Sequence, residues 1–215
     1  MNIPLFENER KIVLSYLMAS FALLIPFPGR FAYGIVLVIT MTVEMFSIIL
    51  FRRFMRFLHL EKMLSVLVAV LLISESIIIG QLLYFFSPVM ALVLSFDIYF
   101  PAASAFVISS MFTIPEGKAS QELLAVAKTS SVFDLFSLVI FAVRDIFGYG
   151  TLSFPSSTGI DEIVIFPASE SSLHPGIFWA TVPGALILCM LFLRIILWIQ
   201  TNITLAGMKQ EVENE

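Results

Sequence analysis

The sequence predicts an all-α integral membrane protein, and three observations lead to this fold class. Of the 215 residues, 59% are hydrophobic and 13% are charged, whereas soluble domains have about 45–50% apolar and about 25% charged residues. The apolar residues form runs of about 20, the length of a membrane-spanning helix, and not the short segments typical of strands. No polar stretch is long enough for a second globular domain. We therefore expect residues 1–215 to form a single polytopic membrane domain.

Six apolar segments are expected to cross the membrane. They are residues 12–25, 31–51, 63–86, 88–114, 123–147 and 177–199. The first ends at the sequence PFPG, because proline lacks the backbone N–H and glycine relaxes the chain. The fourth is interrupted by Asp97 and Pro101, so it should consist of two half-helices. The first and fourth spans are thus predicted to be broken.

The Lys and Arg residues predict the orientation of these spans. With the amino terminus inside the cell, Arg30 and Arg144 lie at the outer ends of predicted spans. The Lys and Arg residues of the other connections and of the termini then lie in the cytoplasm. The cytoplasmic group is Arg10, Lys11, Arg52, Arg53, Arg56, Lys62, Lys118 and Lys209. Because cytoplasmic loops are enriched in Lys and Arg, we expect both termini, with the polar tail 201–215, on the cytoplasmic side of the cell inner membrane. The connection 148–176 then faces outward, and it contains neither Lys nor Arg.

The two broken segments each begin a group of three spans, about residues 10–86 and 87–200. An odd number of spans per half inserts the halves with opposite orientations, which is the inverted repeat of many transporters. The halves correspond in the placement of the breaks and not in sequence identity. We therefore expect an inverted 3+3 repeat.

Four acidic residues within the predicted spans are candidates for an ion path: Glu44, Glu75, Asp97 and Asp134. A charged side chain at the centre of a membrane helix costs about 2.5–3.5 kcal/mol on insertion scales, so such a group is paired, protonated or placed in a watery cavity. Glu75 lies near the middle of its span and could relay Na⁺ or H⁺. Asp97 adjoins the predicted break, where free backbone carbonyls could help an acid to hold a cation. Helix capping is the simpler interpretation of Asp97.

Glu44 has both a structural and a functional interpretation. Thr40, Glu44 and Ser47 are spaced i, i+4 and i+7, so they share one face of a helix that should point to protein or water. Arg194 in the last span is close to Glu44 in depth. The structural interpretation is therefore an ion pair between Glu44 and Arg194, since charges inside membranes usually pair.

Other kinds of site are not predicted. His59 and His174 fall in loops on opposite sides of the membrane, which excludes a bis-histidine haem within it. The sequence contains no zinc-type spacing, glycine-rich phosphate loop or Ser/His/Asp arrangement. Cys189 stands alone and so forms no intrachain disulfide. We expect no metal site, no catalytic residue and no nucleic-acid partner.

Four short motifs, spread over nearly the whole chain, resemble one family of membrane proteins. Residues 141–152, FAVRDIFGYGTL, contain an Arg–acid pair followed by Gly-aromatic-Gly-Thr-Leu. The others are ATVPGA at 180–185, DIYFP at 97–101 and LIP at 24–26. Together they are similar to the six-span membrane subunits of the Rnf and Nqr redox-driven ion pumps. With the amino terminus inside, the chain resembles the E-type subunit of Rnf and the D-type subunit of Nqr.

The resemblance implies a fold, partners and a cofactor. In that family two such subunits pair in inverted orientation, and one cysteine from each half-repeat helps to hold a two-iron two-sulfur cluster. By position these cysteines correspond to Ile25 and Val107, and neither side chain can ligate iron. The resemblance therefore implies a divergent subunit with no cofactor on this chain.

The implied function is that of a scaffold and ion path in an electron-transport complex that moves Na⁺ or H⁺. The implied partners are other Rnf/Nqr-like subunits, including an inverted six-span homologue. On this interpretation the chain is at most a non-catalytic subunit of an ion-translocating oxidoreductase. The alternatives are a stand-alone secondary carrier and a structural membrane protein derived from the same fold.

Overall fold

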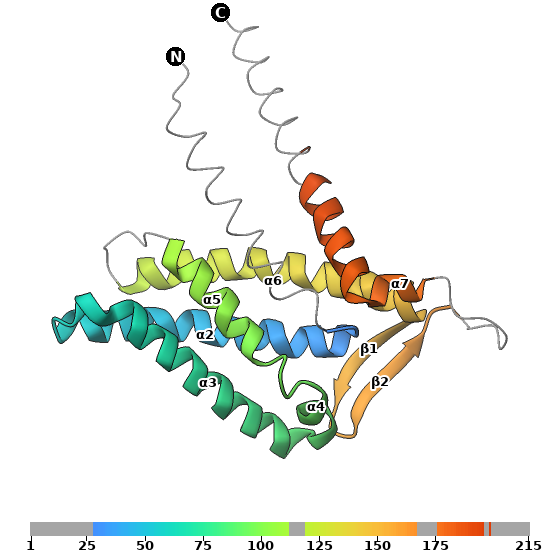
Figure 1. Ribbon diagram of the computed structural model, residues 1–215, viewed down its shortest axis with the longest axis horizontal. Helices are drawn as coiled ribbons and strands as arrows, with labels where there is room; N and C mark the ends of the chain where they lie inside the picture. The colour runs from blue at the N-terminus through green and yellow to red at the C-terminus, as the bar shows by residue number, and fades with distance from the viewer. Residues whose placement is uncertain (1–27, 112–118, 167–175, 196–197, 199–215) are drawn as a thin grey trace, which may run out of the picture.

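A computed structural model describes residues 28–111, 119–166, 176–195 and 198 (Figure 1). The predicted first span, both termini and the tail 201–215 lie outside the described residues, as do Ile25 and His174.

Among the described residues, two helices are long and apolar enough to cross a membrane. They are α2 (Phe31–Phe57) and α3 (Leu64–Phe86), which coincide with the predicted second and third spans. α2 continues past the expected end at residue 51 because charged side chains at a helix end can reach water. A single 3-10 turn, η1 (Glu61–Met63), leads into α3.

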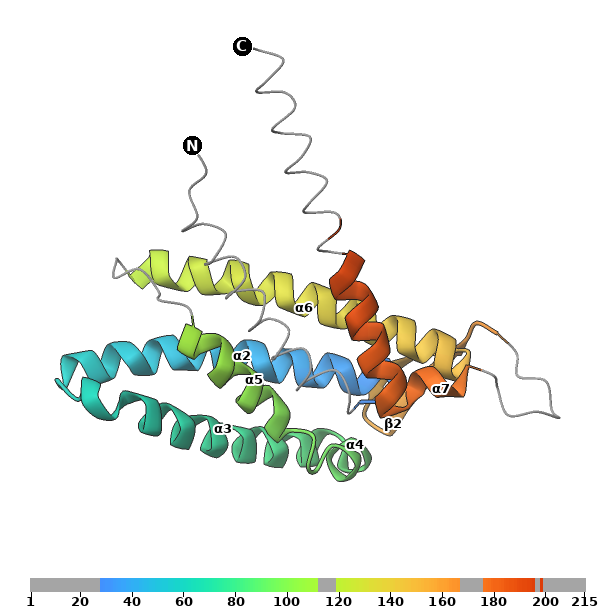
Figure 2. The same cartoon turned by 45° about the horizontal axis from the view of Figure 1, so that its top comes forward.

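The end of α2 shows how the hairpin of α2 and α3 is made. Two backbone N–H groups, of His59 and Leu60, donate to the carbonyls of Arg56 and Met55 respectively. This pair of bonds is a Schellman motif, which closes a helix on a residue in the left-handed region. His59 takes that position with a φ of 58°. The chain therefore reverses at once and sets α3 against α2 (Figure 2).

The predicted fourth span consists of two short helices, α4 (Pro88–Val93) and α5 (Tyr99–Met111), with turns at 94–98 between them. The interruption contains Asp97, as expected. Pro101 instead lies in the first turn of α5, where a missing N–H costs no helical hydrogen bond.

The region after the fifth predicted span corrects the all-α expectation. α6 (Ala119–Tyr149) is followed by an antiparallel hairpin of β1 (Thr151–Ser156) and β2 (Gly159–Val164). Thr151 pairs with Val164 and Ser156 with Gly159. Alternating polar and apolar residues favour strands here, and Gly159 adopts a φ of 132° after the turn.

The last predicted span, 177–199, is also different from the expectation, because it is divided. α7 (Ile177–Ala180) ends before Thr181, and a second helix covers Val182–Ile195. The Thr181 hydroxyl accepts a hydrogen bond from the N–H of Gly184 and so caps the second helix. Pro183 occupies its first turn, where proline is tolerated.

The core lies where α2 contacts α3, α5 and α6 (Figures 1 and 2). Leu37, Met41, Ile48 and Phe141 are among its buried side chains. The helix Val182–Ile195 rises steeply from the layer of α2 and α6 (Figure 1). Six membrane spans are not shown: within the described ranges only α2 and α3 meet both the length and the hydropathy criterion.

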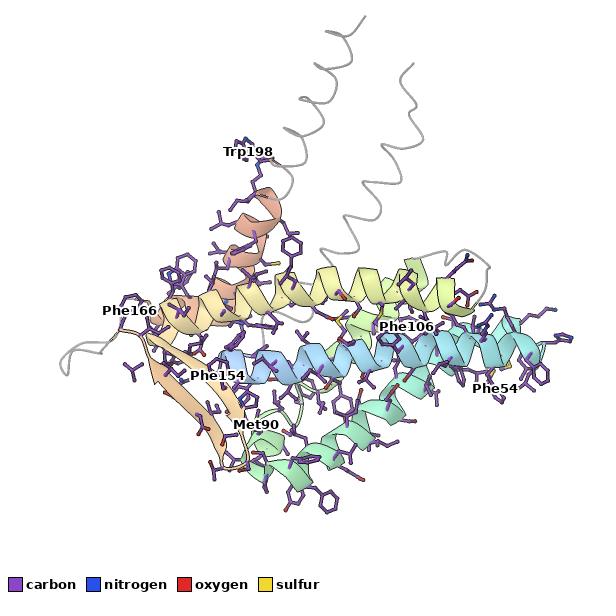
Figure 3. The ribbon with its side chains drawn as sticks, turned by 180° about the vertical axis from the view of Figure 1, so that it is seen from behind. Phe54, Met90, Phe106, Phe154, Phe166 and Trp198 are labelled. Carbon is purple, nitrogen blue, oxygen red and sulfur yellow. The ribbon has the colours of Figure 1, made fainter. Side chains whose placement is uncertain are left out.

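Many large apolar side chains point away from this core. Figure 3 shows Phe54 and Trp198 extending from the helices, with 54% and 65% of their surfaces exposed. α3 alone exposes Val66, Val70, Ile73, Ile78, Leu82 and Phe85. Extended apolar surfaces are rare on soluble monomers and mark contact with lipid or protein.

Candidate ion site between α2 and α3

Two acidic and two serine side chains meet where α2 faces α3. Ser47 on α2 donates a hydrogen bond of 2.6 Å to Oε1 of Glu75 on α3. In the other direction, the hydroxyl of Ser76 on α3 lies 2.9 Å from Oε1 of Glu44 on α2. Each helix therefore supplies one acid and one hydroxyl. We call Glu44, Ser47, Glu75 and Ser76 the α2–α3 acid site.

The second oxygen of each acid in this site has no partner. Glu44 Oε2 and Glu75 Oε2 are buried and make no hydrogen bond within the described part of the chain. Glu44 as a whole is 0% exposed, and no basic side chain in the described ranges forms an ion pair with either acid. A buried, uncompensated negative charge is costly. The site is therefore suited to binding and releasing a proton or another small cation.

The site adjoins a pocket at the broken segment. A cavity of about 390 Å³ lies between α3 and the turn that joins α4 to α5. Its polar lining residues are Ser76, Gln81, Tyr84, Ser95 and Tyr99. Ser76 thus contacts the Glu44 carboxyl group and also borders the cavity, which gives the acid site a polar link to open space.

Asp134, another predicted candidate, forms a separate cluster. Its Oδ2 accepts a hydrogen bond of 3.1 Å from Ser130 on α6 and lies 2.8 Å from the hydroxyl oxygen of Thr42 on α2. Residues two apart on a helix point to nearly opposite sides, so Thr42 and Glu44 face different neighbours. Asp134 therefore lies on the α6 side of α2, apart from the α2–α3 acid site.

Asp97 joins neither cluster. It is half-buried in the turn before α5, and its backbone carbonyl accepts a hydrogen bond from the N–H of Phe100. Of the four candidate acids, the structure brings Glu44 and Glu75 together and leaves Asp97 and Asp134 apart.

The predicted ion pair between Glu44 and Arg194 is not formed. Arg194 is exposed on the last helix, whereas Glu44 is fully buried against Ser76. The break at Thr181 directs the last helix away from the α2–α3 contact (Figure 1). The prediction rested on the similar depth of the two residues in the membrane, and the two side chains do not meet.

Of the two positions that correspond to the family's cluster cysteines, the structure describes Val107 and not Ile25. Val107 is half-buried within α5, and its side chain offers no ligand for iron. Cys189 is buried in the core with 5% exposure. In the described ranges no three His, Cys, Asp or Glu side chains come close enough to hold a metal ion.

The contacts of Arg144 were not predicted from the sequence. Its side chain is 0% exposed, and its guanidinium donates to the backbone carbonyls of Pro28, Trp179 and Ala180. The Pro28 carbonyl lies just before α2, and the other two carbonyls belong to α7. Because the guanidinium has five donors in a rigid plane, one side chain on α6 fixes two other segments.

The neighbouring Asp145 completes this junction. Its Oδ2 accepts hydrogen bonds from the N–H of Phe31 and from both the N–H and the hydroxyl of Ser153. The Ser153 hydroxyl in turn accepts from the N–H of Ala32. The Arg–Asp pair thus joins α6 to α2, β1 and α7. The only signal in the sequence was an Arg–acid pair before a glycine-rich turn.

No protein-family model and no solved structure matches the chain. An uncharacterized protein of Treponema pallidum (strain Nichols) is 28% identical over 177 residues, which cover 82% of this chain and 83% of that protein. The two chains are thus similar along most of their lengths, and this likeness brings with it neither an activity nor a partner.

Proposed function

We propose that this chain is a membrane subunit that carries part of a path for H⁺ or Na⁺, in a complex related to the Rnf and Nqr pumps. The observation that carries the proposal is the α2–α3 acid site. Two acids on facing helices, each with a buried unpartnered oxygen, lie inside the two helices that are long and apolar enough for a bilayer. Intramembrane acids of this kind mark ion and proton paths.

The proposed setting is the cell inner membrane, with six spans and both termini in the cytoplasm. The exposed apolar side chains of α3 support contact with lipid. Arg52, Arg53 and Lys62 lie near the turn between α2 and α3, at the opposite end of α2 from the hairpin that carries Asp161 and Glu162 (Figure 1). This separation of charge favours a cytoplasmic turn and an outer hairpin.

The proposed relationship to Rnf and Nqr rests on motifs. Arg144 and Asp145, in the longest of these motifs, join α6 to α2, β1 and α7. Val107 cannot replace a cluster cysteine, so the proposed role is scaffold and ion path without electron transfer on this chain. The proposed partners are other Rnf/Nqr-like subunits, one of them an inverted six-span homologue.

The first test is to purify the tagged chain from its native membrane in mild detergent and to identify its partners by mass spectrometry. The purified assembly is then placed in liposomes, and ion movement is measured for wild type, Glu44→Gln and Glu75→Gln. Asp161→Asn is the matched control, because Asp161 is exposed on β2. Recovery with redox subunits, and a flux that both Gln variants abolish, is the expected result.

The other outcomes separate the alternatives. A chain recovered alone whose flux depends on Glu75 is a secondary carrier, and the complex is then excluded. A chain that supports no flux, and in which both Gln variants alter stability only, is a structural protein. Either result overturns the proposal as stated.

A further inference from the structure

We propose that Glu44 is a protonated carboxylic acid in the resting protein, that Glu75 beside it is ionised, and that the ion passing this site is therefore a proton. This inference rests on the proposed ion path and specifies what moves along it. Its basis is the number of hydrogen atoms available at the two serine hydroxyls of the α2–α3 acid site.

Ser76 has one hydroxyl hydrogen and two acceptor-type neighbours. Its Oγ lies 2.9 Å from the Leu72 carbonyl and 2.9 Å from Glu44 Oε1. A hydroxyl donates one hydrogen bond and accepts others. Both contacts are fully satisfied when Ser76 donates to the Leu72 carbonyl and Glu44 donates its own proton to Ser76. An ionised Glu44 would have to share a single hydrogen with a backbone carbonyl.

Ser47 presents the opposite situation. Its hydroxyl lies 2.6 Å from Glu75 Oε1 and has no second acceptor among the described residues. Short O–H···O contacts are typical of an ionised acceptor. Ser47 thus donates its only hydrogen to a Glu75 carboxylate. Both acids lie at the same contact of α2 with α3, so one proton on the pair lowers the repulsion between them.

A second acid repeats the Ser76 arrangement independently. The Thr42 hydroxyl lies 3.0 Å from the Val38 carbonyl and 2.8 Å from Asp134 Oδ2. Again one hydrogen faces two acceptor-type atoms, and a protonated Asp134 that donates to Thr42 satisfies both. The contact of α2 with α6 therefore repeats the arrangement found at its contact with α3, one acid beside one hydroxyl that also faces a backbone carbonyl.

Among the side chains that the structure describes, the charged groups packed against α2 supply no cation for Glu44. α5 contains no charged residue. On α3 the acid site contains Glu75. On the described part of α6, Asp134 bonds to Thr42, and Glu122 pairs with Arg56 near the other end of α2. Arg144 and Asp145 bind the chain at Pro28 and Phe31, at the start of α2. A proton on Glu44 thus supplies the positive charge that its described neighbours do not.

Release of the proton uses Ser76. The O–H bond of Glu44 breaks as its proton passes to Ser76 Oγ, and the original Ser76 hydrogen passes to a water molecule in the adjoining cavity. The products are a Glu44 carboxylate and a hydronium ion, and the Ser76 hydroxyl is restored. Uptake is the reverse.

The test is infrared spectroscopy of the full-length chain in lipid bilayers at neutral pH, as difference spectra between variants and wild type. Glu44→Gln should remove a carboxylic acid C=O band that shifts in ²H₂O. Glu75→Gln should remove carboxylate bands instead. Ser76→Ala should shift the acid band and Ser47→Ala the carboxylate band, so the assignment stands even if a Gln variant fails to fold. Asp161→Asn is the exposed control.

Loss of carboxylate bands in Glu44→Gln, with no loss of an acid band, overturns the inference. In liposomes, flux that persists when choline replaces Na⁺ supports a proton, and flux that requires Na⁺ overturns it. The spectra report protonation whether or not the chain transports anything. An acid band at Glu44 without flux would therefore contradict the proposed function alone, and an ionised Glu44 with flux would contradict this inference alone.

Discussion

The carboxylate of Asp145 caps the amino-terminal end of α2, because its Oδ2 accepts a hydrogen bond of 3.1 Å from the N–H of Phe31. The first N–H groups of a helix have no partner inside the helix, and a negative charge there is also favoured by the helix dipole. The same oxygen holds Ser153 of β1. One side chain thus sets the start of α2 relative to the hairpin.

Asp145→Asn should therefore destabilise the fold. The amide loses the charge that three donors share, and its NH₂ group is buried beside Arg30. We expect a loss of about 1–3 kcal/mol, measured by thermal unfolding of the purified chain in detergent. Asp161→Asn, at an exposed position, should change stability by less than about 0.5 kcal/mol. Equal effects of the two substitutions would refute the capping role.

Arg144→Lys should also destabilise the protein, although it keeps the charge. Nη1, Nη2 and Nε each donate to a different carbonyl, and a single ammonium group cannot reproduce that planar arrangement. We expect a loss of about 2–3 kcal/mol, since buried carbonyls lose their partners. The matched control is Lys62→Arg at an exposed position. Full stability of Arg144→Lys would show that charge alone is required.

Two glycines in the candidate membrane helices should respond in opposite ways to alanine. A Cβ at Gly34 on α2 would overlap the Phe141 ring of α6, so Gly34→Ala should cost about 1–3 kcal/mol through overpacking. At Gly80 on α3 the nearest atom, of Ile98, is 3.8 Å away. Gly80→Ala should be neutral or stabilising by up to about 1 kcal/mol.

Unfolding of both variants under the same conditions gives the comparison. Phe141→Leu should partly restore Gly34→Ala, because the smaller side chain frees space at the contact. If both glycines tolerate alanine equally, the close approach of α2 to α6 at Gly34 is wrong.

Hydropathy correctly predicted the helices that consist of one uninterrupted apolar run. α2 and α3 are uniform apolar runs, and so their positions followed from the sequence. The hairpin after Tyr149 was missed because two strands of six residues each are too short for a scan for membrane spans. The break at Thr181 was missed because a Thr cap and a proline in the first turn leave the apolar run uninterrupted.

The acid site was predictable only in part, because the sequence shows which residues share a face of one helix but not which residues of another helix they contact. The helical spacing of Glu44 and Ser47 places both on one face of α2, and both contact α3. Which side chains they meet depends on the register between two helices, and the turn at His59 fixes that register. Depth alone paired Glu44 with Arg194 incorrectly. The contacts of Arg144 reach segments more than 30 residues away and have no local signature.

The proposed orientation can be tested with thiol labelling in intact cells. His59→Cys and Asp161→Cys place single exposed thiols at the α2–α3 turn and on the hairpin, at opposite ends of the molecule (Figure 1). A membrane-impermeant reagent should label Asp161→Cys from outside, and His59→Cys only after the cells are permeabilised. The wild-type chain, with Cys189 buried, should remain unlabelled. Labelling of both variants from the same side would place the turn and the hairpin on one face of the membrane, and α2 could then not be a span.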